Sequence, residues 1–231
     1  MSLFILIHGA WMGSWVWRDI EKILINHGHK VITPDLTMDL VKIKFNQYIN
    51  YLTELINNQS EKVTLVGHSM AGMIISALAE LAPNNISHLV YLCAFLPQNG
   101  ESIFDIIRKF QVDNKIEVTL QANNLLCIVK DNFIEEKFFN CCSKNDVIRA
   151  KSLMRPQSTR ILYEKVKLSN ENFGSIKKSY IKCTQDNIIH SITQNKMIKR
   201  QSVDYIYSMD TDHCPFFSKI HELIQILLLC S

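Results

Sequence analysis

Short apolar runs alternate with longer segments of helical period through the first hundred residues, and this rhythm limits the fold more than any other feature. Three of the runs are rich in apolar or β-branched residues: LFILIHG (3–9), KVTLVGHS (62–69) and ISHLVYLCAFLP (86–97). A strand that is apolar on both faces has to be covered on both faces, as it is in parallel sheets flanked by helices. The sequence therefore predicts an α/β fold with a mostly parallel sheet.

The same rhythm places the remaining elements on either side of an irregular middle segment. A further strand is expected over 29–36, and Ser14 is expected as the N-cap and Gly28 as the stop of the first helix. The expected helices and later strands are as follows: helices 14–28, 45–59, 70–82, 191–200 and 218–230, and strands 177–186 and 203–210. No repeat, low-complexity tract or linker interrupts them, so residues 1–231 are predicted to form a single domain.

The middle segment, about 98–175, breaks the rhythm with polar, mixed sequence. Helices are expected within it at 101–111 and 133–166, and NLLCIVKD (124–131) could form a strand. An insertion in an α/β sheet is most simply a cap over the carboxyl ends of the strands, where open sheets bind ligands. We therefore expect a small inserted cap above a ligand site.

The composition excludes several classes of function. The 25 basic residues are interspersed with 22 acidic ones, for a net charge of +3, so no nucleic-acid partner or polybasic membrane anchor is predicted. Seven cysteines without a C-x-x-C pair indicate free thiols in a reducing compartment, with no zinc site. The apolar stretches near both ends are too short for a signal-peptide core or a membrane span. We expect a soluble, cytoplasmic protein that needs no metal or other cofactor.

Ser69 lies in the pentad GHSMA, where a predicted strand, 62–69, passes into a predicted helix, 70–82. A Gly-x-Ser-x-small pentad should occur by chance in roughly one chain in six of this length, so its context must decide. A nucleophile elbow requires this strand, turn and helix, with small neighbours that let the helix approach the strand. Gly67 and Ala71 are such neighbours, and the context therefore favours Ser69 as a nucleophile rather than a helix-capping turn residue.

A serine hydroxyl needs a base, and the base needs a carboxylate that orients it. Asp186 ends one predicted strand and His213 follows the last one, so both should reach the sheet edge that carries Ser69. The rivals for the acid are Asp210 and Asp212, which share a short loop with His213, and Glu101 and Asp105, which follow the strand 86–97. Asp186 is the preferred acid, because a residue in the same short loop would have to reach around to Nδ1 of the imidazole.

The loop after the first strand, HGAWMGSW, offers the second half of an oxyanion hole. Gly9 would permit an unusual turn and leave room beside the serine, so that the amides of Ala10 and Met70 face one point. Trp11, next to Ala10, is a candidate for the substrate pocket together with Gly9. His8 is predicted to position the turn rather than to act as a base, and His68 is the variable residue of the elbow.

Several stretches spread over nearly the whole chain resemble one branch of the α/β-hydrolase family. These stretches are FILIHGAWMGSWVW, LVGHSMAGM, CSKNDVIRAKSLMRPQS, ENFGSIKKSYIKCTQD and DHCPF. They are similar to plant methyl esterases of the salicylate-binding type and to plant hydroxynitrile lyases. The resemblance implies Ser69 as nucleophile, His213 as general base, Asp186 as its acid, and the amides of Ala10 and Met70 as the oxyanion hole.

The chain departs from this branch in two places. Ala71 stands where the pentad usually has glycine, and the segment after FLPQ is shorter than in the plant enzymes. In the related lyases a threonine follows the first-strand histidine and a lysine follows the catalytic histidine, whereas Gly9 and Cys214 occupy those positions here. The resemblance therefore implies an esterase rather than a lyase.

The sequence predicts a serine hydrolase that cleaves a small carboxylic ester through an acyl-enzyme. The alternatives are hydroxynitrile lyase-like chemistry, a cyclase or thioesterase acting on a biosynthetic intermediate, and a receptor for a small apolar acid that retains an idle triad. The acyl group, the alcohol, the pathway and the oligomeric state stay open.

Overall fold

The computed structural model of the chain describes residues 1–36, 41–42, 44–111 and 117–231. Six strands form the main sheet in the order β2-β1-β3-β4-β8-β9, and every neighbouring pair in it is parallel. The strands are β1 (Leu3–Ile7), β2 (Lys30–Ile32), β3 (Val63–His68), β4 (Ile86–Leu92), β8 (Lys177–Cys183) and β9 (Tyr205–Met209). The predicted α/β class is confirmed.

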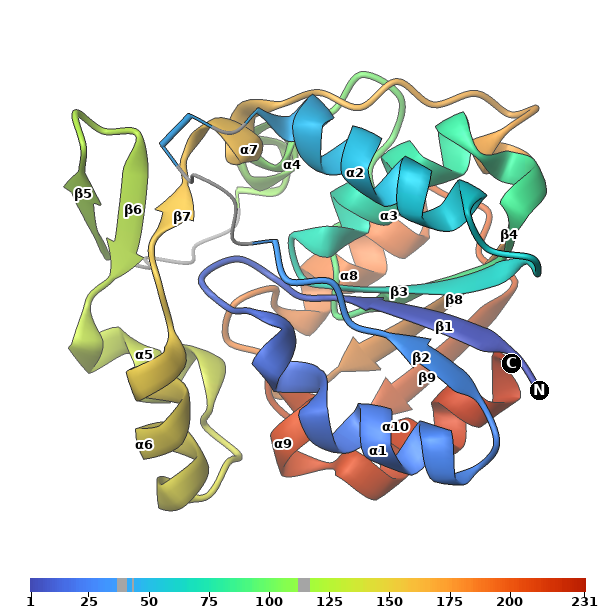
Figure 1. Cartoon of the computed structure of the whole chain (residues 1–231). Helices are drawn as coiled ribbons and strands as arrows, with labels where there is room; N and C mark the ends of the chain where they lie inside the picture. The colour runs from blue at the N-terminus through green and yellow to red at the C-terminus, as the bar shows by residue number, and fades with distance from the viewer. Residues whose placement is uncertain (37–40, 43, 112–116) are drawn as a thin grey trace.

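Helices cover both faces of this sheet (Figure 1). On one face lie α1 (Arg18–Asn26) and α10 (Ile220–Leu229), and on the other α2 (Phe45–Asn57), α3 (Ala71–Leu81) and α8 (Ser191–Ile198). This double cover explains why β1 and β3 are buried at every position. Short helical turns lie at Ser14–Trp17 (η1), Pro83–Asn85 (η2), Phe173–Ser175 (η3) and Pro215–Ser218 (α9).

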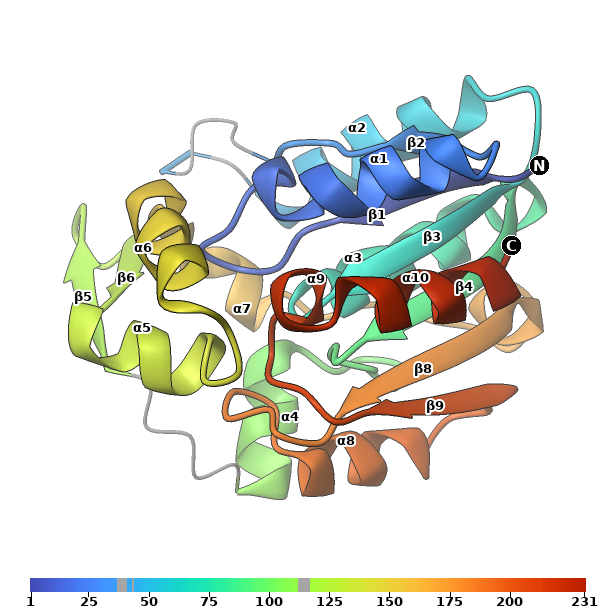
Figure 2. The same ribbon diagram turned by 90° about the horizontal axis from the view of Figure 1, so that it is seen from below.

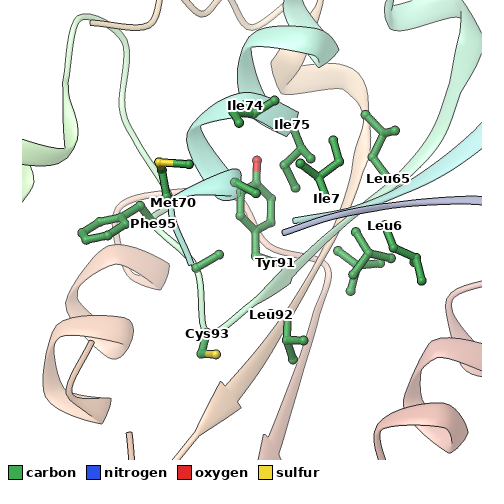
Figure 3. Close-up of a cluster of buried hydrophobic side chains, with 14 of the residues drawn as sticks. Leu6, Ile7, Leu65, Met70, Ile74, Ile75, Tyr91, Leu92, Cys93 and Phe95 are labelled. Carbon is green, nitrogen blue, oxygen red and sulfur yellow. The ribbon is translucent and has the colours of Figure 1, made fainter. Parts of the chain in front are cut away.

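A cluster of buried apolar side chains joins the sheet to α3 (Figure 3). Ile7 of β1, Leu65 of β3 and Tyr91 of β4 lie there on the same side of the sheet as Ile74 and Ile75 of α3, whereas Leu6 points to the opposite face. Tyr91 directs its hydroxyl toward the helix, where it bonds to Ser76 Oγ at 2.7 Å. The cluster fixes α3 on the strands β1, β3 and β4.

Between β4 and β8 the chain leaves the sheet and builds the cap at its carboxyl end, seen at the left of Figures 1 and 2. A three-stranded antiparallel sheet in the order β5-β6-β7 is its centre. The cap elements are α4 (Ile103–Phe110), β5 (Val118–Gln121), β6 (Leu126–Val129), α5 (Asp131–Phe138), α6 (Lys144–Leu153), β7 (Gln157–Ser158) and α7 (Arg160–Tyr163).

Three local predictions were wrong. The segment 133–166 is not one helix, because Ser143 caps a new helix by accepting a bond from the Asp146 amide, and the chain turns extended at Met154 before Pro156. Ser14 is not an N-cap, since it lies inside η1. The strand expected over 29–36 ends at Ile32, just before Pro34, which has no amide to donate.

No helix in the described ranges has the length and apolar character that a membrane-spanning segment requires.

Candidate active site

Ser69 directly follows β3 and adopts a left-handed backbone conformation, with φ at +55°. A side-chain-bearing residue tolerates this conformation only where its surroundings impose it. Here the Ser69 amide donates to the carbonyl of Leu92 at 3.2 Å, and the Phe95 amide donates to the carbonyl of Ser69 at 3.0 Å. The turn is thus fastened on both sides to the end of β4.

Small residues make this turn possible. A Cβ atom at Gly67 would lie 2.8 Å from the carbonyl oxygen of Ala71, and one at Gly72 would lie 2.0 Å from the carbonyl oxygen of Phe95. Ala71 itself is fully buried where the pentad usually has glycine, so its methyl group fits the elbow. The requirement at Gly72 was not predicted, although its place in the first turn of α3 after the elbow was a signal for it.

His213 and Asp186 form a buried pair at the carboxyl ends of β8 and β9. The Nδ1 atom of His213 donates to Oδ2 of Asp186 at 2.8 Å, and the two side chains are 1% and 0% exposed. Asp186 Oδ1 accepts from the amides of Ile188 and Ile189 at 2.7 and 2.9 Å, while Gln194 Nε2 lies 3.4 Å from Oδ2. These donors fix the carboxylate and thereby the orientation of the imidazole ring.

The two rival acids in the His213 loop make other contacts. Asp210 accepts from the Thr184 hydroxyl and the Gln185 amide group, both at 2.9 Å, at the protein surface. Asp212 is buried, and its carboxylate accepts from the amides of Cys141 and Cys214 at 2.8 and 3.1 Å. It therefore fastens the His213 loop to the cap.

The two rivals after β4 are also engaged elsewhere. Glu101 is paired with Arg200 and Lys109. Burial would raise the pKa of its carboxyl, but the hydrogen bond from the Gln98 amide, and then Arg200 and Lys109, lower that pKa below its ordinary value. Asp105 bonds to the Ser102 amide and hydroxyl at the start of α4. Within the described residues, none of the four rivals has a recorded contact with the imidazole of His213.

Ser69 and His213 are not hydrogen-bonded to each other in the described structure. Ser69 is 7% exposed and lines a cavity, whereas His213 is 1% exposed. In ligand-free enzymes such a contact is often long and tightens only when substrate binds. The structure thus assembles the base with its acid and presents the serine separately.

The loop after β1 brings Gly9 and Ala10 against the serine. A Cβ atom at Gly9 would lie 2.9 Å from Ser69 Cβ and 2.8 Å from His68 Nδ1, so this position has no room for a side chain. The prediction that Gly9 adopts an unusual backbone was wrong, because the positive φ of this loop, +61°, belongs to Trp11. Gly9 is required for space rather than for conformation.

Two residues beside Ser69 have backbone amides without an acceptor among the described residues. Ala10 and Met70 both line the cavity beside Ser69, and both are buried. No acceptor for either backbone amide is recorded among the described residues. Unpaired, buried N–H groups beside a serine provide donors for a developing oxyanion.

The two other histidines near the site have structural contacts. His8 Nδ1 donates to the Gly9 carbonyl at 2.9 Å, and its Nε2 accepts from the Leu36 amide at 3.1 Å, which agrees with the expected positioning role. His68 Nε2 donates to the carbonyl oxygen of His213 at 2.8 Å. Burial, and then the neighbouring His213, lower the pKa of His68 well below its ordinary value, so this ring is neutral.

The cavity beside Ser69 has a volume of about 140 Å³ and a mostly apolar lining. An apolar cavity of about 150 Å³ accommodates a benzene molecule. The site residue Trp11 borders this space, while Trp15 and Trp17 lie outside it. The lining residues are Ala10, Trp11, Ser69, Met70, Phe95, Ile103, Phe104, Ile107, Leu162, Tyr163, Ile188, Ile189 and Thr193.

Sequence reasoning missed most of this lining. Phe104, Ile107 and Tyr163 are more than a third exposed and come from the cap helices α4 and α7. For Phe104 and Ile107 the signal was the apolar stripe of 101–111, which predicts only a helix; no comparable signal marks Tyr163.

One set of described residues brings three potential metal ligands together. Single donor atoms of His68, Cys93 and His213 lie within 4.8 Å of one another. Two of these groups already donate to the His213 carbonyl, from Cys93 Sγ at 3.4 Å and His68 Nε2 at 2.8 Å, while His213 Nδ1 donates to Asp186. Burial, and then Cys183, raise the pKa of the Cys93 thiol, which disfavours the thiolate that a metal requires. The donor set does not fit a metal site.

Both the sequence and the structure of the chain are similar to those of known proteins. The sequence model of the alpha/beta hydrolase family matches residues 4–226. Putative methylesterase 11, chloroplastic, from Arabidopsis thaliana is 32% identical over 97% of this chain, and the chain spans 63% of the length of that relative. Methylesterase 2 of Arabidopsis thaliana is 30% identical, with 97% of this chain and 94% of the relative covered.

The structure is similar to that of polyneuridine aldehyde esterase from Rauvolfia serpentina. The two structures have a TM-score of 0.87 and 28% sequence identity, over 99% of this chain and 98% of the other. The fold of this chain is thus similar to that of an esterase over nearly its whole length.

Proposed function

The chain belongs to the alpha/beta hydrolase family, and on that premise we propose that it is a serine hydrolase of small carboxylic esters. The observation that carries the proposal is the position of Ser69. It occupies a left-handed turn beside two unpaired amides, on an apolar cavity, with a buried imidazole–carboxylate pair at the same sheet edge. The named esterases among the relatives support the same reaction.

Ester cleavage would begin with attack of Ser69 Oγ on the carbonyl carbon of the substrate. His213 takes the hydroxyl proton on Nε2, because Nδ1 is already bonded to Asp186. The carboxylate stabilises the imidazolium that forms, and the amides of Ala10 and Met70 stabilise the oxyanion of the tetrahedral intermediate. His213 then gives the proton to the departing alcohol, and an acyl-enzyme remains on Ser69.

Water completes the cycle by the same steps. His213 removes a proton from a water molecule, which attacks the acyl carbonyl and forms a second tetrahedral intermediate in the same oxyanion hole. Collapse of that intermediate returns the proton to Ser69 Oγ and releases the carboxylic acid. Every catalytic group in this proposed reaction cycle comes from the protein, and the reactants are the ester and water.

Gly9 and Cys214 favour hydrolysis over cyanohydrin cleavage. Gly9 has no hydroxyl that could contact a cyanohydrin oxygen, and it leaves the approach to Ala10 and Met70 open. Burial, and then Asp212, raise the pKa of the Cys214 thiol well above its ordinary value, so this group is neutral. A neutral thiol offers no positive charge to stabilise departing cyanide.

The cavity supports a small, uncharged substrate. Among the described residues, the polar side-chain groups of the lining belong to Ser69, Thr193, Tyr163 and Trp11, and no lining side chain is charged. A charged acyl or alcohol group would lose its hydration there without a partner. We therefore propose esters of small apolar acids or alcohols, methyl esters included, as the substrate class.

A second proposal concerns the location of the protein. Seven cysteines without a disulfide bond support a reducing compartment such as the cytoplasm. Fractionation of cells that express a tagged chain, followed by thiol titration, tests this proposal. Recovery in an oxidising compartment would contradict it.

The function is tested with a panel of methyl, aryl and thioesters, with mandelonitrile, and with a fluorophosphonate probe. We expect turnover of small apolar esters, mandelonitrile cleavage at background, and a single phosphonate adduct on Ser69 in peptide maps. Ser69→Ala is the matched variant and should lose both turnover and label. Adducts on Ser14 or Ser76, cyanide release above the Ser69→Ala rate, or saturable product binding without turnover would each overturn the proposal.

A further inference from the structure

The loop that carries Ala10 is held by the cap rather than by the sheet. Its residue Trp11 has φ at +61°, a conformation that persists in a residue with a side chain only where surrounding contacts impose it. Three cap residues make those contacts. The Trp11 amide donates to Gln157 Oε1 at 3.3 Å, the Trp11 carbonyl accepts from the Arg155 amide at 3.0 Å, and the indole N–H donates to the Cys127 carbonyl at 3.1 Å.

The side chain of Arg155 extends this grip along the loop. Its Nε donates to the carbonyl of Met12 at 3.1 Å, and its Nη2 pairs with the carboxylate of Asp35, which follows β2. The guanidinium lies directly over Gly13, where an added Cβ atom would come within 2.1 Å of Nη2. The side chain of Arg155 therefore contacts Met12 and Gly13 and links them through Asp35 to the edge of the sheet.

This arrangement bears on the amide next to Ser69. Because the peptide between Ala10 and Trp11 is planar, fixing the amide of Trp11 fixes the orientation of the Ala10 carbonyl. The buried Ala10 methyl group restricts the rest of the residue, so its own N–H has little freedom to turn away from the cavity. A displacement of about 1 Å at such a donor can cost roughly 10²-fold in rate.

We propose that Arg155 and Gln157 are positioning residues that hold the loop 8–13 in the conformation in which the Ala10 amide faces Ser69. This inference rests on the proposed ester hydrolysis and extends it to two residues that line no part of the cavity. They act on the transition state through the loop and do not contact the substrate. The cap thus supplies part of the catalytic geometry as well as the roof of the pocket.

The test compares Arg155→Met and Gln157→Leu with the native protein on the best ester of the panel. We expect kcat to fall about 10- to 100-fold while KM stays within about twofold, because a misplaced oxyanion donor weakens mainly the transition state. Arg155→Lys should recover little, since an ammonium cannot bond to Met12 and Asp35 in the same geometry. Arg160→Met, at an exposed arginine of the same cap segment, is the matched control and should leave kcat unchanged.

A second variant reaches the same contact from the other side. Gly13→Ala leaves Arg155 in the chain but places a methyl group where its guanidinium lies, so it should reproduce the kcat loss. The double variant Gly13→Ala/Arg155→Met should be no slower than either single variant, because both remove one interaction. Additive losses would overturn the proposal.

A third readout does not depend on activity. Hydrogen–deuterium exchange of the peptide that contains residues 8–13 should accelerate in Arg155→Met and Gln157→Leu and stay native in Arg160→Met. Native exchange, or native kcat, in both cap variants would overturn the positioning role. If the native protein turns over no ester, the proposed function fails, while the exchange data still decide whether these residues hold the loop.

Discussion

Asp186 binds His213 through one carboxylate oxygen and uses the other to accept two backbone amides. Oδ2 lies 2.8 Å from His213 Nδ1, and Oδ1 accepts from Ile188 and Ile189 at 2.7 and 2.9 Å. The amides hold the carboxylate in one rotamer, so the imidazole ring is oriented by a group that cannot turn away. This pairing separates Asp186 from every other acid near the site.

Asp186→Asn should lower kcat by several orders of magnitude. An amide in this position cannot stabilise the imidazolium and can favour the wrong tautomer of His213, a change that costs roughly 10⁴ in a serine protease. Stopped-flow measurement of p-nitrophenyl acetate hydrolysis, with circular dichroism to verify folding, gives the value. Asp210→Asn is the control and should cost far less, because Asp210 bonds to Thr184 and Gln185 at the surface. A larger loss at Asp210 would contradict the assignment.

Gly9→Ala should lower ester hydrolysis by about 10²-fold or more. Its methyl group would lie 2.9 Å from Ser69 Cβ and 2.8 Å from His68 Nδ1, so the loop or the serine has to shift and one oxyanion donor is misplaced. Gly9→Thr should be slower still. Gly174→Ala serves as the control, since its Cβ would meet the Ser169 carbonyl at 3.3 Å, outside the cavity lining. A native rate in Gly9→Ala would mean that the space beside Ser69 is not needed.

The hydrogen bond between Tyr91 and Ser76 should make two deletions unequal. Ser76 Oγ donates to the Gly72 carbonyl at 2.6 Å and bonds to the Tyr91 hydroxyl at 2.7 Å, so Tyr91→Phe leaves the serine with a partner and should cost about 1 kcal/mol. Ser76→Ala leaves the fully buried hydroxyl of Tyr91 without this partner and should lower the free energy of unfolding by about 1–3 kcal/mol. Urea unfolding measures both. Adding Tyr91→Phe to Ser76→Ala should be neutral or stabilising, and a further loss there would contradict this account.

Asp35 should make stability depend on acid pH. The His8 ring, and also the Arg155 guanidinium, lower the pKa of Asp35 to about 2 against the opposing effect of partial burial, whereas the unfolded value is about 3.9. Because the folded pKa is the lower one, the contribution is complete above about pH 5 and is lost as the pH falls toward 2. The difference in urea midpoint between native protein and Asp35→Asn should therefore shrink between about pH 4.5 and 2.5. A difference that is constant over this range would refute the linkage.

The main sheet, and the sheet edge that carries Ser69, Asp186 and His213, could be predicted from the sequence because both depend on local signals. Apolar runs such as 62–69 identify the strands, and residues that follow parallel strands gather at one edge whatever lies between them. Ser69, Asp186 and His213 each follow a strand in this way. Their positions could be predicted without knowing a single tertiary contact.

The cap could not be predicted in the same way. The strand β5 has four residues with little burial and β7 has two, so neither leaves a period in the sequence. The segment 133–166 does not form the expected helix, because Ser143 begins a new helix and Pro156 follows its end, while the apolar pattern continues past both. The contacts of Arg155 and Gln157 with the loop after β1 join segments far apart in the chain, which no local pattern records.

The cap enters the chain between β4 and β8, which are neighbours in the sheet, with Leu92 opposite Ile181. For the sheet, the whole inserted segment is therefore one long loop between two paired strands. Each doubling of the length of such a loop adds only about 0.6 kcal/mol to the entropic cost of closing it. Changes at α4 and α7, which carry the lining residues Phe104, Ile107 and Tyr163, should consequently be cheap for the sheet while they reshape the roof of the cavity. The contacts with Trp11 limit this freedom. A cap transplanted from a relative has to bring equivalents of Arg155 and Gln157, since without them we expect the catalytic rate to fall as the substrate selectivity changes. In this chain, selectivity is easiest to change in α4 and α7 and most constrained at the two residues that contact the first loop.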